Sequence, residues 1–246
     1  MSTLIRYYER FAKEAKEICK GRVYTDHLRR YAYGVDASCY SYLPKVVVKA
    51  EDEREVRRLI RLCQQCGTPF TFRAAGSSLS GQCSSEDVLI VCNDGFKKME
   101  VIDDGKALKC ECGVIGSDAN DLLKPYNRKI GPDPATLATA LVGGILNNNS
   151  SGMCCGTAQN SYKTIRSIRV VLLDGSILDT SDQKSIDQFL KEKPQMVEDL
   201  LQLRKEILAD EELTHLIHHK YKIKNTTGYG LNSLVDFEDI IDIINH

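Results

Sequence analysis

The chain has almost no excess of charge of either sign. Its 246 residues include 33 Lys and Arg against 34 Asp and Glu, for a formal net charge of −1. The sequence has no basic excess that would indicate nucleic-acid binding. It also has no block of like charges that would indicate an acidic partner. The N-terminus lacks the apolar core of a signal peptide, and no stretch approaches the roughly 18 apolar residues of a membrane span. We therefore expect a cytoplasmic protein that binds no nucleic acid, with peripheral association with a membrane left open.

Ten cysteines are many for this length, and without a secretion signal they are expected to be reduced. Cys63 and Cys66 form a C-x-x-C at the end of a predicted helix, whereas redox pairs usually lie at a helix start. No second pair has metal-ligand spacing, so we predict two semi-buried helix thiols. Cys110 and Cys112 share one face of a predicted strand, and we expect both in the core.

The apolar pattern of the first hundred residues predicts a helical segment followed by a βαβ unit. Residues 1–33 have helical patterning. A β-branched run at 46–48 is followed by an acidic-capped helix that ends at Gly67, and by strands at 68–72 and 87–92. Strand, helix and strand at this spacing predict a parallel sheet.

The rest of the chain has a different pattern. Alternating residues around Asp104-Gly105 and around Asp174-Gly175 predict two antiparallel hairpins, and residues 115–127 predict a short helix between them. After about residue 182 the pattern is helical and charged, and 235–246 has the pattern of a final helix. The expected fold class is α+β, with a small parallel βαβ sheet followed by a larger, mostly antiparallel sheet flanked by helices.

Two segments, 73–82 ("RAAGSSLSGQ") and 131–164, are rich in Gly, Ser and Asn. A diphosphate needs several backbone amides that converge on it, and small residues let the backbone come close. The Rossmann G-x-G-x-x-G is absent, and Gln82 stands where a P-loop needs Lys. A plain turn between strands is the alternative, but two such segments in one chain favour a phosphate site.

Five motifs occur in order and with the spacing of a known family: "PKVVVKAEDEREV", "GTPFTFRAAGSSLSG", "GPDPAT", "VGGILNNNSSG" and "RVVLLDG". With them the chain resembles the FAD-linked oxidase family, which has the fold of vanillyl-alcohol oxidase and p-cresol methylhydroxylase. Within the family it most resembles the branch of D-lactate dehydrogenase and the flavin subunit of glycolate oxidase. The resemblance extends from about Tyr33 onward.

The resemblance implies FAD as the cofactor and assigns residues to it. Residues 74–82 match the loop that binds the pyrophosphate, and 132–134 match a segment beside the flavin ring and ribityl chain. Thr139, Gly143 and Gly144 match a second phosphate- and ring-contacting turn. The stretch that wraps the isoalloxazine is matched by Asn148, Asn149, Ser151 and Gly152. The full set of implied cofactor-binding residues is Arg73, Ala74, Ala75, Gly76, Ser77, Ser78, Leu79, Gly81, Gln82, Pro132, Asp133, Pro134, Thr139, Gly143, Gly144, Asn148, Asn149, Ser151, Gly152 and Gly156.

The departures from the family pattern concern covalent linkage and metal. Relatives that tether FAD through the first loop have His where this chain has Ser77, so we predict non-covalent FAD. Cys154 and Cys155 are near the expected ring position, but bonding needs an activated thiolate, and we predict packing thiols. "HLIHH" at 215–219 has metal-compatible spacing without an accompanying carboxylate motif, so we predict a solvated helix face and no metal.

The resemblance also implies a division of the chain. We expect an N-terminal helical segment (1–43), a parallel βαβ FAD-binding subdomain (44–100), and an antiparallel FAD-binding subdomain with a helical C-terminal part (101–246). Family members continue into a substrate-binding cap domain, so the chain looks truncated. The catalytic residues are expected in that missing part, and none is assigned here.

Three functions remain open at this point. The first is the FAD-binding portion of an oxidoreductase that oxidises a D-2-hydroxy acid by hydride transfer to flavin N5, with an iron–sulfur or electron-transfer partner. The second is an FAD-dependent enolpyruvyl-sugar reductase of the same fold. The third is a non-catalytic module that binds flavin or docks to a partner.

Overall fold

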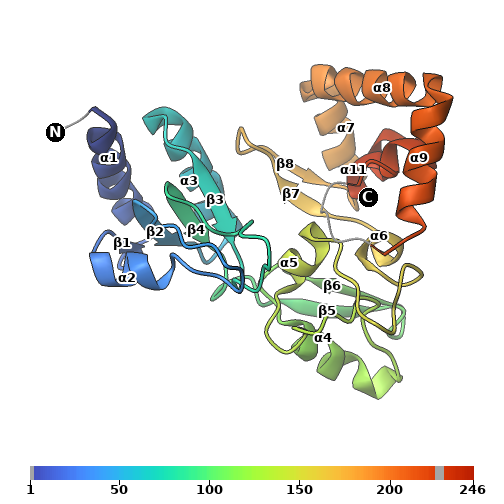
Figure 1. Ribbon diagram of the computed structural model, residues 1–246, viewed down its shortest axis with the longest axis horizontal. Coiled ribbons are helices and arrows are strands. Elements are labelled where there is room, and N and C mark those ends of the chain that lie inside the picture. Colours follow the sequence, from blue (N-terminus) through green and yellow to red (C-terminus); the bar gives the residue numbers. More distant parts are fainter. Residues whose placement is uncertain (1–2, 225–229) are drawn as a thin grey trace. The chain divides into compact units, whose positions relative to one another are not determined.

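The computed structural model describes residues 3–224 and 230–246 (Figure 1). The chain divides into two compact units, and each is described by itself. The first unit consists of Met1–Ile130, Thr136–Gly144 and Leu173–Ser176, and the second of Gly131–Ala135, Ile145–Leu172 and Ile177–His246.

A four-stranded sheet is the centre of the first unit. Its strand order is β1 (Val23–Tyr24), β2 (Val46–Lys49), β4 (Val88–Val91), β3 (Phe70–Arg73). Strand β4 pairs in parallel with β2 and β3, and all four of its side chains are fully buried. A central parallel strand covered on both faces is apolar throughout. The predicted βαβ unit is confirmed.

Helices α1 (Thr3–Ile18) and α3 (Glu53–Cys66) pack on each other in the first unit. The Asp52 side chain caps α3 by accepting a hydrogen bond from the Glu55 amide, and Gly67, at φ 64°, ends it in the left-handed conformation. Cys63 and Cys66 are buried in this helix. Burial raises the pKa of the Cys63 thiol to about 12, so it is an unreactive packing group, as predicted.

Residues 1–33 do not form the helical segment that the pattern predicts. Helix α1 ends at Ile18, β1 pairs antiparallel with β2, and the short helix α2 (His27–Ala32) follows. The cause is a tertiary interaction next to β1. The Arg22 guanidinium binds the Glu55 carboxylate through two hydrogen bonds of 2.6 and 2.8 Å, and it also donates to the Lys49 carbonyl. These bonds hold the chain at the edge of the sheet.

The antiparallel hairpin of β5 (Met99–Ile102) and β6 (Ala107–Cys110) is formed as predicted, with Gly105 at φ 84° in its turn. Helix α4 (Gly116–Leu123) follows, and a 3₁₀ turn, η1 (Lys124–Tyr126), extends it. Cys110 packs against a buried cluster that includes Val114 and Ala119. Cys112 lies beyond the end of β6 and is exposed, so the expected core position was wrong for this residue.

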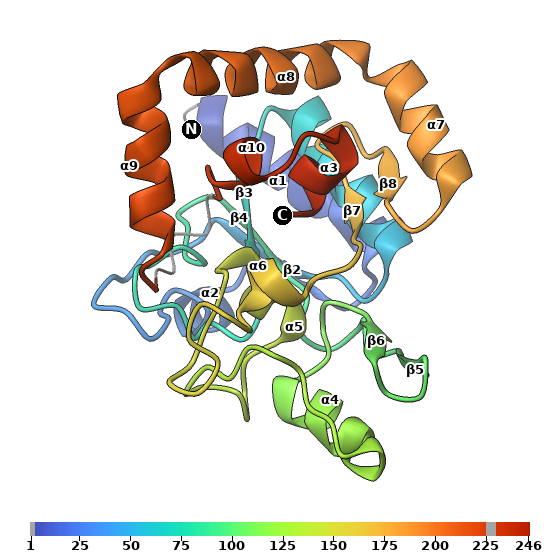
Figure 2. The ribbon, with the colours of Figure 1, turned by 90° about the vertical axis from the view of Figure 1, so that its right-hand side faces the viewer.

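The second unit combines a hairpin with a set of helices. Strands β7 (Arg169–Val171) and β8 (Ile177–Asp179) form the predicted antiparallel pair. Figure 2 shows α8 between α7 and α9, and α10 and α11 pack against α8. The helices are α5 (Val142–Asn147), which begins in the first unit, α6 (Ser161–Thr164), α7 (Gln183–Glu192), α8 (Pro194–Ala209), α9 (Glu211–Tyr221), α10 (Ser233–Asp236) and α11 (Ile240–Asn245).

The helices of the second unit enclose a core of Ile207, Ile217, Leu234 and Ile243. The pattern at 235–246 predicts one helix, but the chain is extended at Phe237. The Asp239 side chain then caps α11 by accepting from two backbone amides. An N-cap inside an apolar pattern starts a new helix there.

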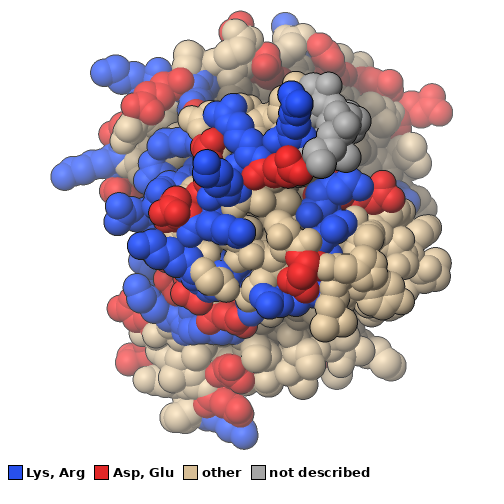
Figure 3. Space-filling model, turned by 90° about the vertical axis from the view of Figure 1, so that its left-hand side faces the viewer, with Lys and Arg blue, Asp and Glu red and all other residues tan. Residues whose placement is uncertain are grey.

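The α+β class, with parallel and antiparallel sheets flanked by helices, is confirmed. Within the described residues, the antiparallel part consists of two separate two-stranded sheets. Among these residues no helix is long and apolar enough to cross a membrane. On the face in Figure 3, basic side chains lie among acidic ones. On α1, Arg10 and Glu14 form an ion pair at 2.9 Å.

The burial of β4 gives a first prediction. Leu89→Ala should lower the free energy of unfolding by about 3 kcal/mol, because it leaves a cavity at a fully buried position. The same substitution at Leu28, which is 77% exposed on α2, should change it by less than about 0.5 kcal/mol. Urea unfolding followed by circular dichroism measures both values. Equal effects of the two substitutions would contradict the central position of β4.

Candidate functional site

The first small-residue loop leaves the carboxyl end of β3 in the first unit. Its residues are partly buried or exposed, and Gly76 and Gly81 have φ values of 78° and 71°. Within the described chain, the amides of residues 74–77 donate to no protein acceptor. Such a row of unpaired amides with small side chains is suited to an anion with several oxygens. The residues present therefore fit the diphosphate of FAD.

Arg73, the last residue of β3, uses its side chain within the protein. The guanidinium donates to the carbonyls of Val35 at 2.8 Å and Tyr33 at 3.3 Å, and it lies over the Tyr33 ring. A Cβ added to Gly76 would come within 2.3 Å of this guanidinium, so glycine lets the loop close over the Arg73 side chain. The structure thus gives Arg73 a scaffolding contact at the start of the loop.

The structure brings a second predicted segment of the first unit against this loop. A Cβ added to Gly144 on α5 would lie 3.5 Å from the Ala74 Cβ. The neighbouring Gly143 donates from its amide to the Cys112 carbonyl at 2.9 Å, and an added Cβ would come within 2.7 Å of the Cys112 Cβ. Glycine is needed for the close approach at 143, whereas an added Cβ at 144 would make an ordinary van der Waals contact with Ala74. Thr139 is exposed in the preceding turn.

In the second unit, Asp133 and Gly152 bring two further predicted segments together. The Asp133 carboxylate accepts hydrogen bonds from the amides of Cys155 at 3.1 Å and Cys154 at 3.2 Å. Hydrogen bonding with Cys155 and Cys154 outweighs burial and lowers the pKa of Asp133 to about 2. A Cβ added to Gly152 would come within 1.9 Å of the Asp133 carbonyl oxygen, so only glycine fits there.

Other predicted residues of the second unit differ in whether their polar side chains have hydrogen-bond partners. Asn149 has a left-handed φ of 41°, and its side-chain oxygen accepts from the Tyr162 amide at 3.0 Å. Ser151 is buried, and its Oγ has no partner among the described residues. A buried hydroxyl without a partner is uncommon, and a bound ligand can supply one. Pro132 is buried, and Pro134, Asn148 and Gly156 are partly exposed.

The two adjacent thiols of the second unit have different surroundings. The Cys155 thiol is buried and accepts from the Gly152 amide at 3.0 Å, which agrees with a packing role. The Cys154 thiol is exposed. The side chains of His215, His218 and His219 on α9 are exposed as well, as expected for a solvated face. Over the described parts of the chain, no group of three His, Cys, Asp or Glu could hold a metal ion.

Sequence reasoning missed several residues that touch the predicted segments. Lys224, which is exposed, donates from Nζ to the Gly152 carbonyl at 3.4 Å in the second unit. In the first unit, Asp36 and Tyr40 lie against the first loop. These contacts join residues about 40 to 70 positions apart in the sequence, and no local motif marks them.

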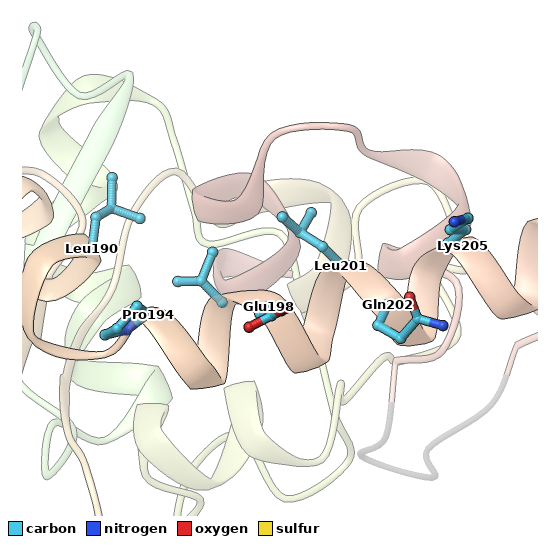
Figure 4. Close-up of a pocket in the computed structure, with 7 residues that line it drawn as sticks. Leu190, Pro194, Glu198, Leu201, Gln202 and Lys205 are labelled. Atoms are coloured by element: carbon cyan, nitrogen blue, oxygen red, sulfur yellow. The ribbon is translucent and has the colours of Figure 1, made fainter.

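An open groove lies along α8 in the second unit (Figure 4). It is mainly apolar, and none of its residues belongs to the predicted cofactor segments. Its lining residues are Leu190, Pro194, Val197, Glu198, Leu201, Gln202 and Lys205.

Comparison with known proteins decides the family. The FAD binding domain family matches residues 44–181, which is more than half of the chain. The chain belongs to this family. FAD as the cofactor class, and the recognition of an FAD-linked oxidase, are thereby confirmed. The contacts that individual residues make with FAD stay predictions.

Relatives of this FAD binding domain include D-2-hydroxyglutarate dehydrogenase of Escherichia coli (strain K12), 28% identical over 65% of the chain and 16% of the relative. Glycolate oxidase subunit GlcD of Bacillus subtilis (strain 168) is 26% identical over 64% of the chain and 34% of the relative. D-lactate dehydrogenase of Archaeoglobus fulgidus is 28% identical over 54% of the chain and 30% of the relative. The chain thus spans only a minor part of the length of these relatives.

Solved structures agree on the fold. Alkyldihydroxyacetonephosphate synthase matches with a TM-score of 0.60 at 21% identity, over 70% of this chain and 35% of that one. p-Cresol methylhydroxylase matches with a TM-score of 0.58 at 15% identity, over 71% of this chain and 35% of that one.

The contact between Gly152 and Asp133 yields a prediction within the family fold. Gly152→Ala should lower the free energy of unfolding by about 3 kcal/mol, because the new Cβ overlaps the Asp133 backbone. Gly156→Ala is the matched control, because its φ of 52° adds strain but nothing lies within 4 Å of a Cβ there. The control should cost about 1 kcal/mol. Urea unfolding measures both, and equal costs would contradict the described approach of the two segments.

The lowered pKa of Asp133 predicts a dependence of stability on pH. Because the folded-state pKa, about 2, lies below the unfolded value, the stabilisation by the carboxylate is full above about pH 4 and is lost as the pH falls toward 2. Wild type should therefore be more stable than Asp133→Asn at pH 6, and the difference should shrink at pH 3. Urea unfolding of both proteins at pH 6, 5, 4 and 3 tests this. A difference that stays constant over the series would refute it.

Proposed function

We propose that this chain is the FAD-binding portion of an FAD-dependent oxidoreductase that oxidises a D-2-hydroxy acid. The observation that carries the proposal is the row of unpaired amides at 74–77, inside the segment that matches the FAD binding domain family. The relatives support the substrate class, because their names specify D-2-hydroxyglutarate, glycolate and D-lactate, which are all 2-hydroxy acids.

In this proposal each unit contributes a pair of segments that meet within that unit. In the first unit, the amides of 74–77 bind the pyrophosphate oxygens, and Gly144 keeps the adjoining surface free of side chains. In the second unit, Asp133 fixes the 152–155 turn, and the Ser151 hydroxyl is available to the cofactor. The chain's residues therefore bind and orient the cofactor. The division at residues 43 and 100 is retained as part of the proposal.

Bound FAD supplies a two-electron acceptor, flavin N5, for the hydride of the substrate α-carbon. No residue of this chain is assigned as the catalytic base. An electron-transfer or iron–sulfur protein is proposed as the partner that reoxidises the flavin.

The proposal includes non-covalent binding. Ser77 stands where tethered relatives have His, and its hydroxyl is not a linking group. The Cys155 thiol is buried and engaged with Gly152, which leaves it poorly placed for attack on a ring.

Absorption spectroscopy of the purified chain with added FAD tests the proposed function. The chain should bind FAD, and acid precipitation should release the flavin into the supernatant. Flavin retained in the pellet would contradict non-covalent binding, and a Cys154→Ala variant would show whether that thiol is the tether. No flavin bound at saturating FAD would overturn the cofactor site of this chain.

Ser77→Asp tests the location of the site. A carboxylate in the loop repels the diphosphate, and we expect FAD to bind at least about tenfold more weakly, which is a loss of about 1.4 kcal/mol. Ser117→Asp, at the start of α4, adds the same charge to the same unit outside the predicted segments and should leave the affinity unchanged. Titration by flavin fluorescence gives both dissociation constants. Equal affinities of the two variants would place the diphosphate elsewhere.

A further inference from the structure

The segment formed by residues 33–42 lies between α2 and β2 in the first unit and is folded on itself. The Tyr42 amide donates to the Gly34 carbonyl at 2.8 Å, and Val35 pairs with Ser41 in an isolated antiparallel bridge. Gly34 is buried, and an added Cβ would come within 2.5 Å of the Tyr42 carbonyl oxygen. The segment is therefore a closed loop with a defined shape.

This segment contacts the 73–82 loop at points from its beginning to its end, and it also contacts the adjoining Cys83. At the beginning, the Arg73 guanidinium donates to the carbonyls of Tyr33 and Val35. In the middle, the Ala37 amide donates to the Gly76 carbonyl at 3.1 Å. Near the end, the Tyr40 ring lies so close to Gly81 that an added Cβ would be 2.8 Å from a ring carbon.

Asp36 makes a further contact, with Cys83, and it also fixes its own segment. One carboxylate oxygen accepts from the Ser38 amide at 2.8 Å and from the Ser38 hydroxyl at 2.5 Å. The other oxygen accepts from the Cys83 thiol at 3.3 Å. One oxygen of the carboxylate thus fixes the 33–42 segment, and the other joins that segment to Cys83, the residue after the loop.

The protonation states of Asp36 and Cys83 agree with this geometry. Burial alone would raise the pKa of the Asp36 carboxyl, but hydrogen bonds from Ser38 and Cys83 outweigh it and hold that pKa below its ordinary value. Burial, and then the hydrogen bond to Asp36, raise the pKa of the Cys83 thiol. The sulfur therefore keeps its proton and serves as the donor.

The loop needs such support, because its own hydrogen bonds join Ser78 to Ser80 and Gln82 and do not reach residues 74–77. Its side chains are small, Leu79 is 79% exposed, and the amides of 74–77 make no hydrogen bond within the described structure. A stretch without such bonds loses conformational entropy when it binds a ligand, unless it is held in advance.

We propose that Asp36 is a positioning residue for the cofactor loop, which holds residues 74–79 in the arrangement that binds a diphosphate. This rests on the proposed function, since it takes the diphosphate to be that of FAD. Asp36 does not touch the cofactor in this proposal. It acts through Ser38 and Cys83, and the segment that carries it completes the site from outside the matched residues 44–181.

The test compares the affinities of the chain for FAD and for ADP, which contains the diphosphate without the flavin. Asp36→Ala should weaken FAD and ADP binding by the same factor, at least about tenfold. Cys83→Ala should weaken both in the same direction, and Cys83→Ser, which keeps a donor, should bind better than Cys83→Ala. Asp26→Asn, at the N-cap of α2 just before the segment, is the control and should bind as wild type does.

Circular dichroism and thermal unfolding without ligand show whether each variant is folded. If Asp36→Ala does not fold, the affinities for FAD and ADP are compared instead for Asp36→Asn, Cys83→Ala and Cys83→Ser. Folded Asp36 and Cys83 variants that bind FAD and ADP as tightly as wild type would overturn the proposal. So would a loss confined to FAD with unchanged ADP binding. If wild type itself binds neither FAD nor ADP, the proposed function fails first, which separates the two failures.

Discussion

Among the described residues, the amides of 74–77 in the loop after β3 have no protein acceptor, and the rest of the first unit has to hold this stretch in shape. A backbone held by its own hydrogen bonds has none left for a ligand, so a loop that offers amides must be shaped by its surroundings. Here the start of the loop is fixed by β3, whose neighbour β4 is buried on both faces. Its further course is fixed by contacts with the 33–42 segment.

In the second unit, by contrast, amides of the glycine-rich segment have an acceptor within the chain. The amides of Cys154 and Cys155 are taken up by the Asp133 carboxylate, so the turn is shaped by an anion that belongs to the chain itself. The close approach at Gly152 is possible only without a side chain. Two glycine-rich segments of similar composition thus differ physically: in the second unit the amides of Cys154 and Cys155 are engaged by the chain, whereas in the first unit the amides of residues 74–77 have no partner among the described residues.

Local sequence was sufficient where local interactions decide the structure. The caps at Asp52 and Gly67 define α3, and the Asp-Gly pairs mark both hairpins. It failed where a distant partner decides: the Arg22–Glu55 ion pair holds the chain beside β1, within a segment that has helical patterning. At the site, the motifs identified the loop, but the role inferred for Asp36 depends on Cys83, 47 residues away, and no spacing rule connects the two.

The loop has no lysine at the P-loop position, and its one arginine is engaged within the protein, so a positive side chain is not the main source of its affinity for a diphosphate. Gln82 stands where a P-loop has Lys, and the Arg73 guanidinium is directed at two carbonyls of the 33–42 segment. A diphosphate on this loop would then be held mainly by neutral amides, whose hydrogen bonds depend on direction more steeply than a point charge does. Small displacements of the loop would cost several such bonds at once. A segment that fixes the loop from outside therefore has more influence on binding here than it would in a site that relies on lysine.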